Sequence, residues 1–127
     1  MTHPTTLAAM IEAQGAEHVA LAAATGQAVS YPSPLTFRGL TNQILDTMAQ
    51  LNGWGIGRGD RVAIVLPNCP EMATAFVAIG SACTAAPLNM AYTDKDFSFY
   101  MGDIGANAVV VAEHDGNAVA AEVARRL

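Results

Sequence analysis

The chain has 127 residues, enough for one domain with a hydrophobic core; 52% of its residues are hydrophobic and 13% are charged. The charged fraction is about half of that usual in soluble domains, so the chain either buries more of itself than a domain of this size does or presents apolar surface to a partner. A formal net charge of −5 with scattered basic residues argues against a nucleic-acid partner.

The first 34 residues predict one short helix and two weak strands. Apolar residues recur at helical spacing over residues 7–14, behind Thr5 or Thr6 as the cap. Residues 18–31 form the weak strand pair, which turns at Gly26, and the stretch "YPSP" then breaks the pattern.

The following segment predicts an amphipathic helix. A short extended "LTF" (35–37) leads into about 15 helical residues, which Gly53 and Gly55 end. Its apolar face carries Leu40, Ile44, Met48 and Leu51.

From Arg61 onward, strands and helices alternate. "RVAIVL" is apolar at every position after Arg61, which is typical of a strand buried on both faces in a parallel sheet. Asn68 or Cys69 caps the next helix, with Pro70 in its first turn. That helix is apolar nearly all round, so we expect it to be largely buried, and "AAPLN" follows as a short strand. Its main face carries Met72, Phe76, Ile79 and Cys83.

The last third of the chain repeats this pattern. Thr93 caps a helix that Gly105 stops, and "AVVVA" (108–112) predicts a second strand buried on both faces. Residues 118–127 predict a final helix. The apolar faces of the two helices carry Phe97, Tyr100, Met101 and Ile104, and Val119, Val123 and Leu127. The order β-α-β-α-β-α predicts an α/β fold: an open, mostly parallel sheet flanked by helices.

Residue types that often carry chemistry have structural explanations here. The glycines within residues 53–59 follow a helix and precede a strand, the reverse of a dinucleotide-binding loop, so we interpret them as a turn. Asp60 and Arg61 are expected to make contacts in that turn. Asp94 and Asp96 lie in the first turn of a helix, where acids complement the helix dipole.

No metal or nucleophile motif is visible in the sequence. The three histidines, His3, His18 and His114, share no ligand spacing, and the serines lack a G-x-S-x-G context. We therefore assign no catalytic, cofactor-binding or metal-binding residue within the chain.

The loops after the strands are the best positions for a ligand. In open α/β sheets, ligands bind beyond the carboxyl ends of the strands. These loops span residues 67–71, 89–93 and 113–116, and Asn68 is a candidate contact, with a cap or turn role as its default.

The two cysteines are too few for a disulfide framework. Cys69 and Cys83 lack C-x-x-C spacing, so we expect buried free thiols and a reducing cytoplasm. The amino terminus has no basic region of a signal peptide, and the apolar run over residues 72–88 is too weak and too short to predict a membrane span.

A series of motifs resembles a known family. "LTFRGL", "GIGRGDRVAIVLPNCPEMATAFVAIGSACTAAPLN" and "YTDKDFSFYMGDIGANAVVV" together resemble the amino-terminal part of the adenylate-forming acyl-CoA synthetases, the AMP-dependent synthetase and ligase superfamily. The resemblance covers about residues 35–112 and is specific in the order and spacing of its pieces.

The resemblance implies a scaffold role. Members of this family activate a carboxylate with ATP to an acyl-adenylate and usually pass the acyl group to coenzyme A. Their phosphate loop, adenine-site motifs and catalytic lysine lie in later parts of such chains and match no residue here, where Lys95 is the only lysine. The chain would then be an incomplete amino-terminal subdomain, with residues 1–34 as a leading segment and 35–127 as a β-α scaffold, inactive alone. ATP, magnesium, coenzyme A and a small carboxylic acid would belong to the parent enzyme, and the remainder of the parent chain would be its partner.

Three positions depart from the family pattern: Gly39, Ala82 and Met90. Gly39 stands where an acidic residue often completes a capping box with Thr36, so Gly39→Glu is expected to stabilise the fold.

The alternative to a scaffold is a free-standing small α/β binding or interaction module derived from the same fold. Because the predicted strands need cover on both faces, we also expect the isolated chain to self-associate.

Overall fold

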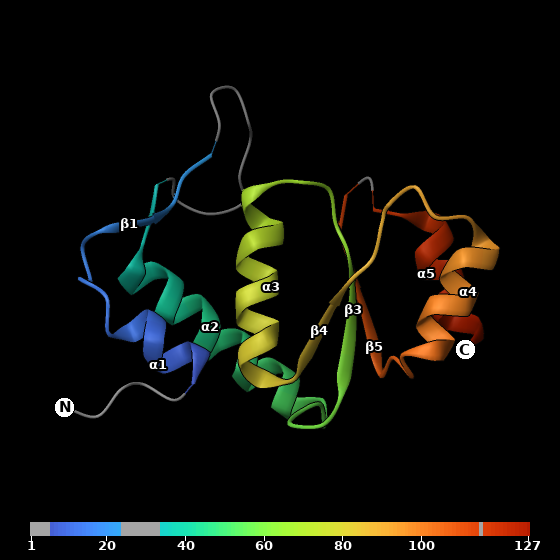
Figure 1. The fold of residues 1–127 in the computed structure, drawn as a ribbon, viewed down its shortest axis with the longest axis horizontal. Helices are drawn as coiled ribbons and strands as arrows, with labels where there is room; N and C mark the ends of the chain where they lie inside the picture. Colours follow the sequence, from blue (N-terminus) through green and yellow to red (C-terminus); the bar gives the residue numbers. More distant parts are fainter. Residues whose placement is uncertain (1–5, 24–33, 115) are drawn as a thin grey trace.

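The computed structural model of the protein describes residues 6–23, 34–114 and 116–127. A parallel sheet lies between two groups of helices (Figure 1). One side carries α1 (Leu7–Glu12), α2 (Phe37–Gly53) and α3 (Pro70–Ala82), and the other carries α4 (Asp94–Asp103) and α5 (Ala118–Arg126). The predicted α/β class and its flanking helices are confirmed.

The sheet has β3 (Arg61–Val65) at its centre, between β4 (Thr84–Pro87) and β5 (Ala108–Val111), and both neighbours run parallel to it. Residues 62–65 are 0% exposed, because β3 has a strand on each side and helices over both faces. The predicted burial of this strand is confirmed.

The expectation for the second apolar strand is wrong in one respect. All four residues of β5 are half-buried, not buried. The helix α5 packs on this strand, but among the described residues β5 pairs with β3 alone and forms one edge of the sheet. An edge strand keeps one side open to solvent whatever its side chains are.

A second, two-stranded sheet lies near the amino terminus. β1 (Val19–Leu21) pairs antiparallel with β2 (Leu35–Thr36). The predicted turn at Gly26 and the second strand of the predicted pair, residues 27–31, lie outside the described residues. Within the described part of the chain, the strand at residues 19–21 pairs with the extended "LT" before α2.

Three helices begin with a side-chain cap, as the sequence predicts, whereas Cys69 stands at the predicted N-cap position of α3 without a side-chain capping bond. Thr6 and Thr36 accept hydrogen bonds from the backbone N–H groups three residues later, and Thr93 forms a capping box with Asp96. At the other end of α2, the helix runs through Gly53 to Trp54, which is 73% exposed. Gly55, with φ of 79°, reverses the chain in the left-handed region that glycine tolerates.

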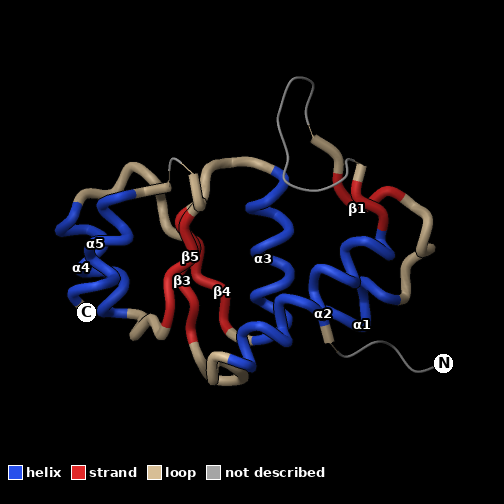
Figure 2. Tube along the Cα trace, turned by 180° about the vertical axis from the view of Figure 1, so that it is seen from behind, coloured by secondary structure: helices blue, strands red, loops and turns tan. Residues whose placement is uncertain are grey.

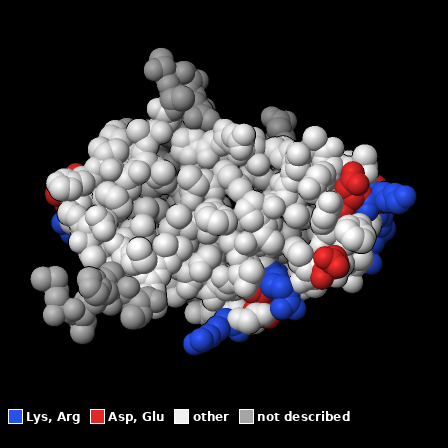
Figure 3. All heavy atoms as spheres, viewed as in Figure 1, with Lys and Arg blue, Asp and Glu red and all other residues white. Residues whose placement is uncertain are grey.

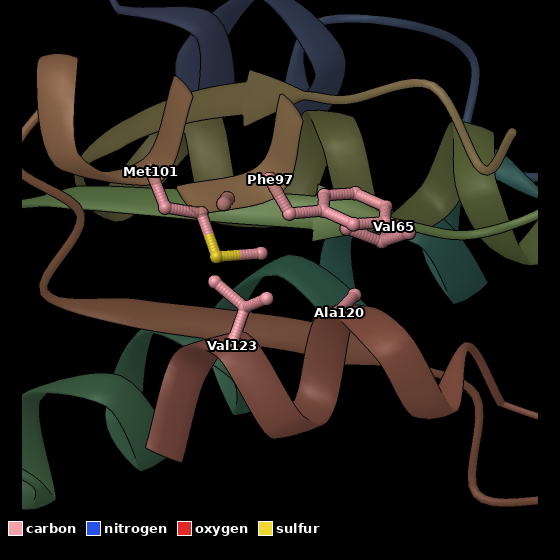
Figure 4. Close-up of a cluster of buried hydrophobic side chains, with 6 residues drawn as sticks. Val65, Phe97, Met101, Ala120 and Val123 are labelled. Atoms are coloured by element: carbon pink, nitrogen blue, oxygen red, sulfur yellow. The ribbon is translucent and has the colours of Figure 1, made fainter. Parts of the chain in front are cut away.

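One buried cluster fills the space between β3, α4 and α5 (Figure 4). The side chains of Met101 from α4 and Val123 from α5 point toward each other, and Phe97 is 0% exposed. The predicted face of α5 is wrong at its ends: Val119 is 43% and Leu127 is 71% exposed. The buried side of α5 is instead formed by Ala120 and Val123, because the small Ala120 lets the helix approach the sheet closely.

On the other face, α3 lies between the sheet and α2 (Figure 2). Its buried residues are Pro70, Thr74, Ala78 and Ile79. Phe76 is 46% exposed, so the expectation that this apolar helix is largely buried is wrong for its outer side.

Candidate functional site

A hollow of about 460 Å³ lies beyond the carboxyl ends of β3 and β4. It is the position where open α/β sheets bind ligands. Its lining comes from the loop after β3 with the first turn of α3 and from the end of β4 with its loop: Leu66, Pro67, Asn68, Met72, Pro87, Leu88, Asn89 and Met90. The structure therefore brings together the first two of the three predicted ligand loops.

Hydrogen bonds fix these loops. The Asn89 side-chain oxygen accepts from the backbone N–H of Ala91 at 2.9 Å, which closes the turn after β4. The Asn117 side-chain amide donates to the carbonyl oxygen of Met90 at 2.8 Å. This bond joins the start of α5 to the rim of the hollow. Asp115, in the third predicted loop, lies outside the described residues.

The chemistry available in the hollow is limited. Among its described lining residues, the amides of Asn68 and Asn89 are the polar side chains, and the others are apolar. Such a surface can contact an apolar group and hydrogen-bond one polar group. It supplies no acid, base or nucleophile, so it cannot move a proton or form a covalent intermediate.

The two aspartates of α4 act as structural groups, as predicted. Asp96 accepts from the backbone N–H of Thr93 at 2.9 Å, and this bond is the main cause that lowers the pKa of its carboxyl. Asp94 pairs with Arg126 at 2.7 Å, and the hydrogen bond from Arg126 is the main cause that lowers its pKa. Both carboxylates are therefore held charged and engaged at a helix start.

The glycine-rich stretch is a turn, also as predicted. The carboxylate of Asp60 accepts from the backbone N–H of Gly57 at 2.8 Å. Arg61 Nε donates to the carbonyl oxygen of Gly105 at 3.3 Å and Nη1 to that of Gly59 at 3.4 Å. These bonds join the start of β3 to the turn that precedes β5.

The cysteines are free and half-buried, so the expectation of buried thiols holds only in part. Burial is the main cause that raises the pKa of Cys83, and the nearby charge of Asp60 adds to it. A thiol with a raised pKa stays protonated at neutral pH and is a poor nucleophile. Among the described residues, no group of three or more His, Cys, Asp and Glu side chains is placed to hold a metal ion.

Two features at this end of the sheet were missed by sequence reasoning. Asn117 caps α5 by accepting from the backbone N–H of Ala120 at 2.9 Å, and an Asn directly before a helical stretch is the signal that could have found it. Tyr92 stacks on Tyr100 with ring centroids 4.9 Å apart. No sequence signal indicates this pair, because Tyr92 lies in a loop.

None of the described helices combines the length and apolar character that a membrane crossing needs.

A parallel α/β sheet with a hollow beyond the carboxyl ends of its strands is the arrangement of ligand-binding α/β proteins. The chain belongs to the AMP-binding enzyme family, whose model matches residues 9–127. The predicted resemblance is thereby confirmed.

Individual relatives agree with this assignment. Oxalate–CoA ligase from Arabidopsis thaliana is 43% identical over 74 residues, which are 58% of this chain and 14% of that protein. The solved N-terminal domain of FACL13 from Mycobacterium tuberculosis is 26% identical with a TM-score of 0.58, over 72% of this chain and 22% of the other.

O-succinylbenzoate coenzyme A synthetase from Bacillus subtilis, solved with AMP, shares the fold: its TM-score is 0.69 at 24% identity, over 85% of this chain and 27% of the other. The chain thus spans less than a third of the length of each of these proteins. Its fold is that of the amino-terminal region of adenylate-forming enzymes.

Proposed function

We propose that the chain is the amino-terminal scaffold of an ATP-dependent acyl-CoA synthetase. Such an enzyme joins a carboxylate to AMP with release of pyrophosphate and then transfers the acyl group to the thiol of coenzyme A. The observation that carries the proposal is the family match over residues 9–127. Relatives such as oxalate–CoA ligase, which is named for joining a carboxylic acid to coenzyme A, support a small carboxylic acid as the substrate of the whole enzyme.

The residues described here do not fit a magnesium–ATP complex. Magnesium in such sites is held through carboxylates and phosphates, and phosphates are neutralised by Lys, Arg or backbone N–H clusters. The hollow offers two amides and otherwise apolar groups. Binding of ATP, magnesium and coenzyme A is therefore proposed for other parts of the enzyme, and no reaction step is derived for this chain.

The surface supports a scaffold role within a larger protein. Residues 72–93, which form α3 after its first two residues, β4 and the loop after β4, contain no Asp, Glu, Lys or Arg. In the face seen in Figure 3, the charged side chains lie near its left, right and lower margins and leave its middle uncharged. Exposed apolar side chains such as Phe76 on α3 suit contact with the remainder of the enzyme, which would lie in the reducing cytoplasm.

The test is ATP–pyrophosphate exchange with the isolated 127-residue chain and a panel of aliphatic and aromatic carboxylic acids. We expect no exchange above background, because the chain supplies no group that stabilises a transferring phosphate. Far-UV circular dichroism of the same sample verifies that the chain is folded. Exchange by a folded sample would overturn the proposed inactivity.

The hollow favours one second candidate, a free-standing small-molecule binding module. Its mixture of apolar lining and two amides can hold a small ligand without catalysis. NMR titration with the same acids separates the two: saturable shifts at Asn68 and Asn89 would favour the module, and their absence favours the scaffold.

A further inference from the structure

One asparagine of the chain is followed directly by glycine. Asn52 precedes Gly53 near the end of α2, whereas every other asparagine is followed by a residue that carries a Cβ atom. Both residues of this pair are exposed. Asparagine before glycine is the arrangement that deamidates most readily, because no Cβ atom hinders the approach of the following backbone nitrogen to the side-chain carbonyl carbon.

The last turn of α2 restrains this pair. The backbone N–H of Trp54 donates to the carbonyl oxygens of Gln50 at 3.2 Å and Leu51 at 3.0 Å, and that of Ile56 donates to Leu51 at 2.9 Å. Leu51 is 5% exposed and anchors the turn in the core. Beyond it, residues 52–55 are all exposed, and two of them are glycines, which weaken a helix. A helix end with few buried contacts opens locally without unfolding of the core, so this turn can open by itself.

We propose that Asn52 is a site of spontaneous modification, at which the chain deamidates when the last turn of α2 opens. The backbone nitrogen of Gly53 gives its proton to a solvent base and bonds to Cγ of Asn52, and the side-chain amide leaves as ammonia. Water then opens the resulting succinimide ring at either carbonyl, which leaves aspartate or isoaspartate at position 52. The reaction consumes one water molecule and needs no other reactant.

The surroundings of Asn52 disfavour the charge that this reaction creates. Its side-chain oxygen lies 3.4 Å from the place that a Cβ atom on Gly57 would take, and the carboxylate of Asp60 accepts from the backbone N–H of Gly57 at 2.8 Å. A carboxylate at position 52 would therefore approach a second carboxylate. It would also lie at the carboxyl end of a helix, where the helix dipole is negative.

Isoaspartate has a further effect, because it adds a methylene group to the main chain. The helical hydrogen bonds join residues four apart, so an extra backbone atom at position 52 disturbs the bonds of the last turn. The modification thus loosens the connection between α2 and β3, which runs through Gly57 and Asp60. It does not depend on the reaction proposed above for the whole enzyme.

Peptide mass spectrometry of the chain during incubation in mildly alkaline buffer tests the site. We expect a mass gain of about 1 Da, that of an amide converted to an acid, to accumulate at Asn52 before any other asparagine. The conversion should be faster in urea, where the helix no longer restrains the pair. If Asn52 stays intact in buffer, or if another asparagine converts as fast, the proposal is wrong.

Variants separate the reaction from its consequence. Gly53→Ala should slow the conversion in urea, where helix stability plays no part, at least about tenfold, and equal rates would exclude attack by this backbone nitrogen.

Asn52→Asp reproduces one product with an unchanged side-chain shape. We expect a lower urea midpoint than that of the freshly purified unaltered chain, and a smaller difference when both carry Asp60→Asn, because one of the two charges is then absent. An equal midpoint in the first comparison, or an undiminished loss in the second, would refute the charge contact.

Discussion

At the scale of single residues, Asn117 joins the start of α5 to the loop after β4. Its side-chain oxygen caps α5, and its amide donates to the carbonyl oxygen of Met90, 27 residues earlier in the chain. Both bonds are partly buried, so water replaces neither fully when the side chain is removed. The start of α5 and the rim of the hollow are thereby positioned by one amide.

Asn117→Ala is expected to lower the free energy of unfolding by about 1–3 kcal/mol, because it removes a helix cap and leaves the Met90 carbonyl oxygen without its donor. Asn117→Asp is the matched control, since a carboxylate keeps the cap acceptor and loses the amide donor. Urea unfolding followed by circular dichroism measures both. An alanine variant as stable as the unaltered chain would show that neither bond contributes.

At Gly39, the packing of the structure changes the stability effect that the sequence predicts for a substitution. A Cβ atom at this position would lie 2.6 Å from Cδ1 of Leu35, which is only 6% exposed. The crowding costs about 1–3 kcal/mol, which exceeds the gain of up to about 1 kcal/mol from removing glycine from a helix. We expect Gly39→Ala to lower stability by about 1 kcal/mol and Gly39→Glu to give no net gain.

A double-mutant cycle separates the two causes. In a Leu35→Ala background the crowding atom is absent, so Gly39→Glu should become stabilising in urea unfolding. If Gly39→Glu raises stability in the unaltered chain as well, Leu35 moves aside at little cost and the crowding argument fails.

At the scale of elements, the start of α4 makes stability depend on pH. The pKa values of Asp94 and Asp96 are lowered in the fold, so the folded state binds fewer protons than the unfolded state. Their contribution is present above the unfolded pKa of about 4 and is lost as pH falls through the lower folded values.

We therefore expect the urea midpoint to decrease from about pH 5 to about pH 2, and to decrease less in a variant carrying Asp94→Asn and Asp96→Asn. The same variant should be less stable than the unaltered chain at neutral pH. Parallel pH curves for the two proteins would show that other groups control the acid transition.

Local signals in the sequence predicted most of the elements. Thr36 and Thr93 mark helix starts through bonds within three residues, and a continuous apolar run marks β3. Burial of β5 was not predictable in the same way, because its valines resemble those of β3 and the difference lies in which strand has neighbours on both sides. Strand order is a property of the folded chain and leaves no local signal.

The candidate site was predictable as a region and not as a set of contacts. The rule for open α/β sheets identified the loops that contain Asn68 and Asn89, and these loops line one hollow. The bond between Asn117 and Met90 joins residues 27 positions apart, so no spacing rule could indicate it. The sequence likewise could not indicate that a side chain at position 39 would crowd Leu35, because this depends on how Leu35 packs in the fold.

At the scale of the whole molecule, the two ends of the sheet differ in polarity. The amino ends of β3 and β5 are joined by polar contacts of Arg61 and Asn107, while the carboxyl ends of β3 and β4 border the largely apolar hollow. Together with the uncharged segment over residues 72–93, this leaves apolar surface at the carboxyl end and over α3, where the remainder of an acyl-CoA synthetase is proposed to lie.

The exposed indole of Trp54 has a practical consequence for spectroscopy. It is the single tryptophan of the chain, and it already lies in water at the end of α2 when the protein is folded. Its emission is therefore expected to sit near the long-wavelength limit in the native state and to change little on denaturation. A blue shift on mixing with another protein would instead report coverage of the turn that carries Gly55 and Gly59, which makes this residue a built-in fluorescent reporter for one end of the molecule.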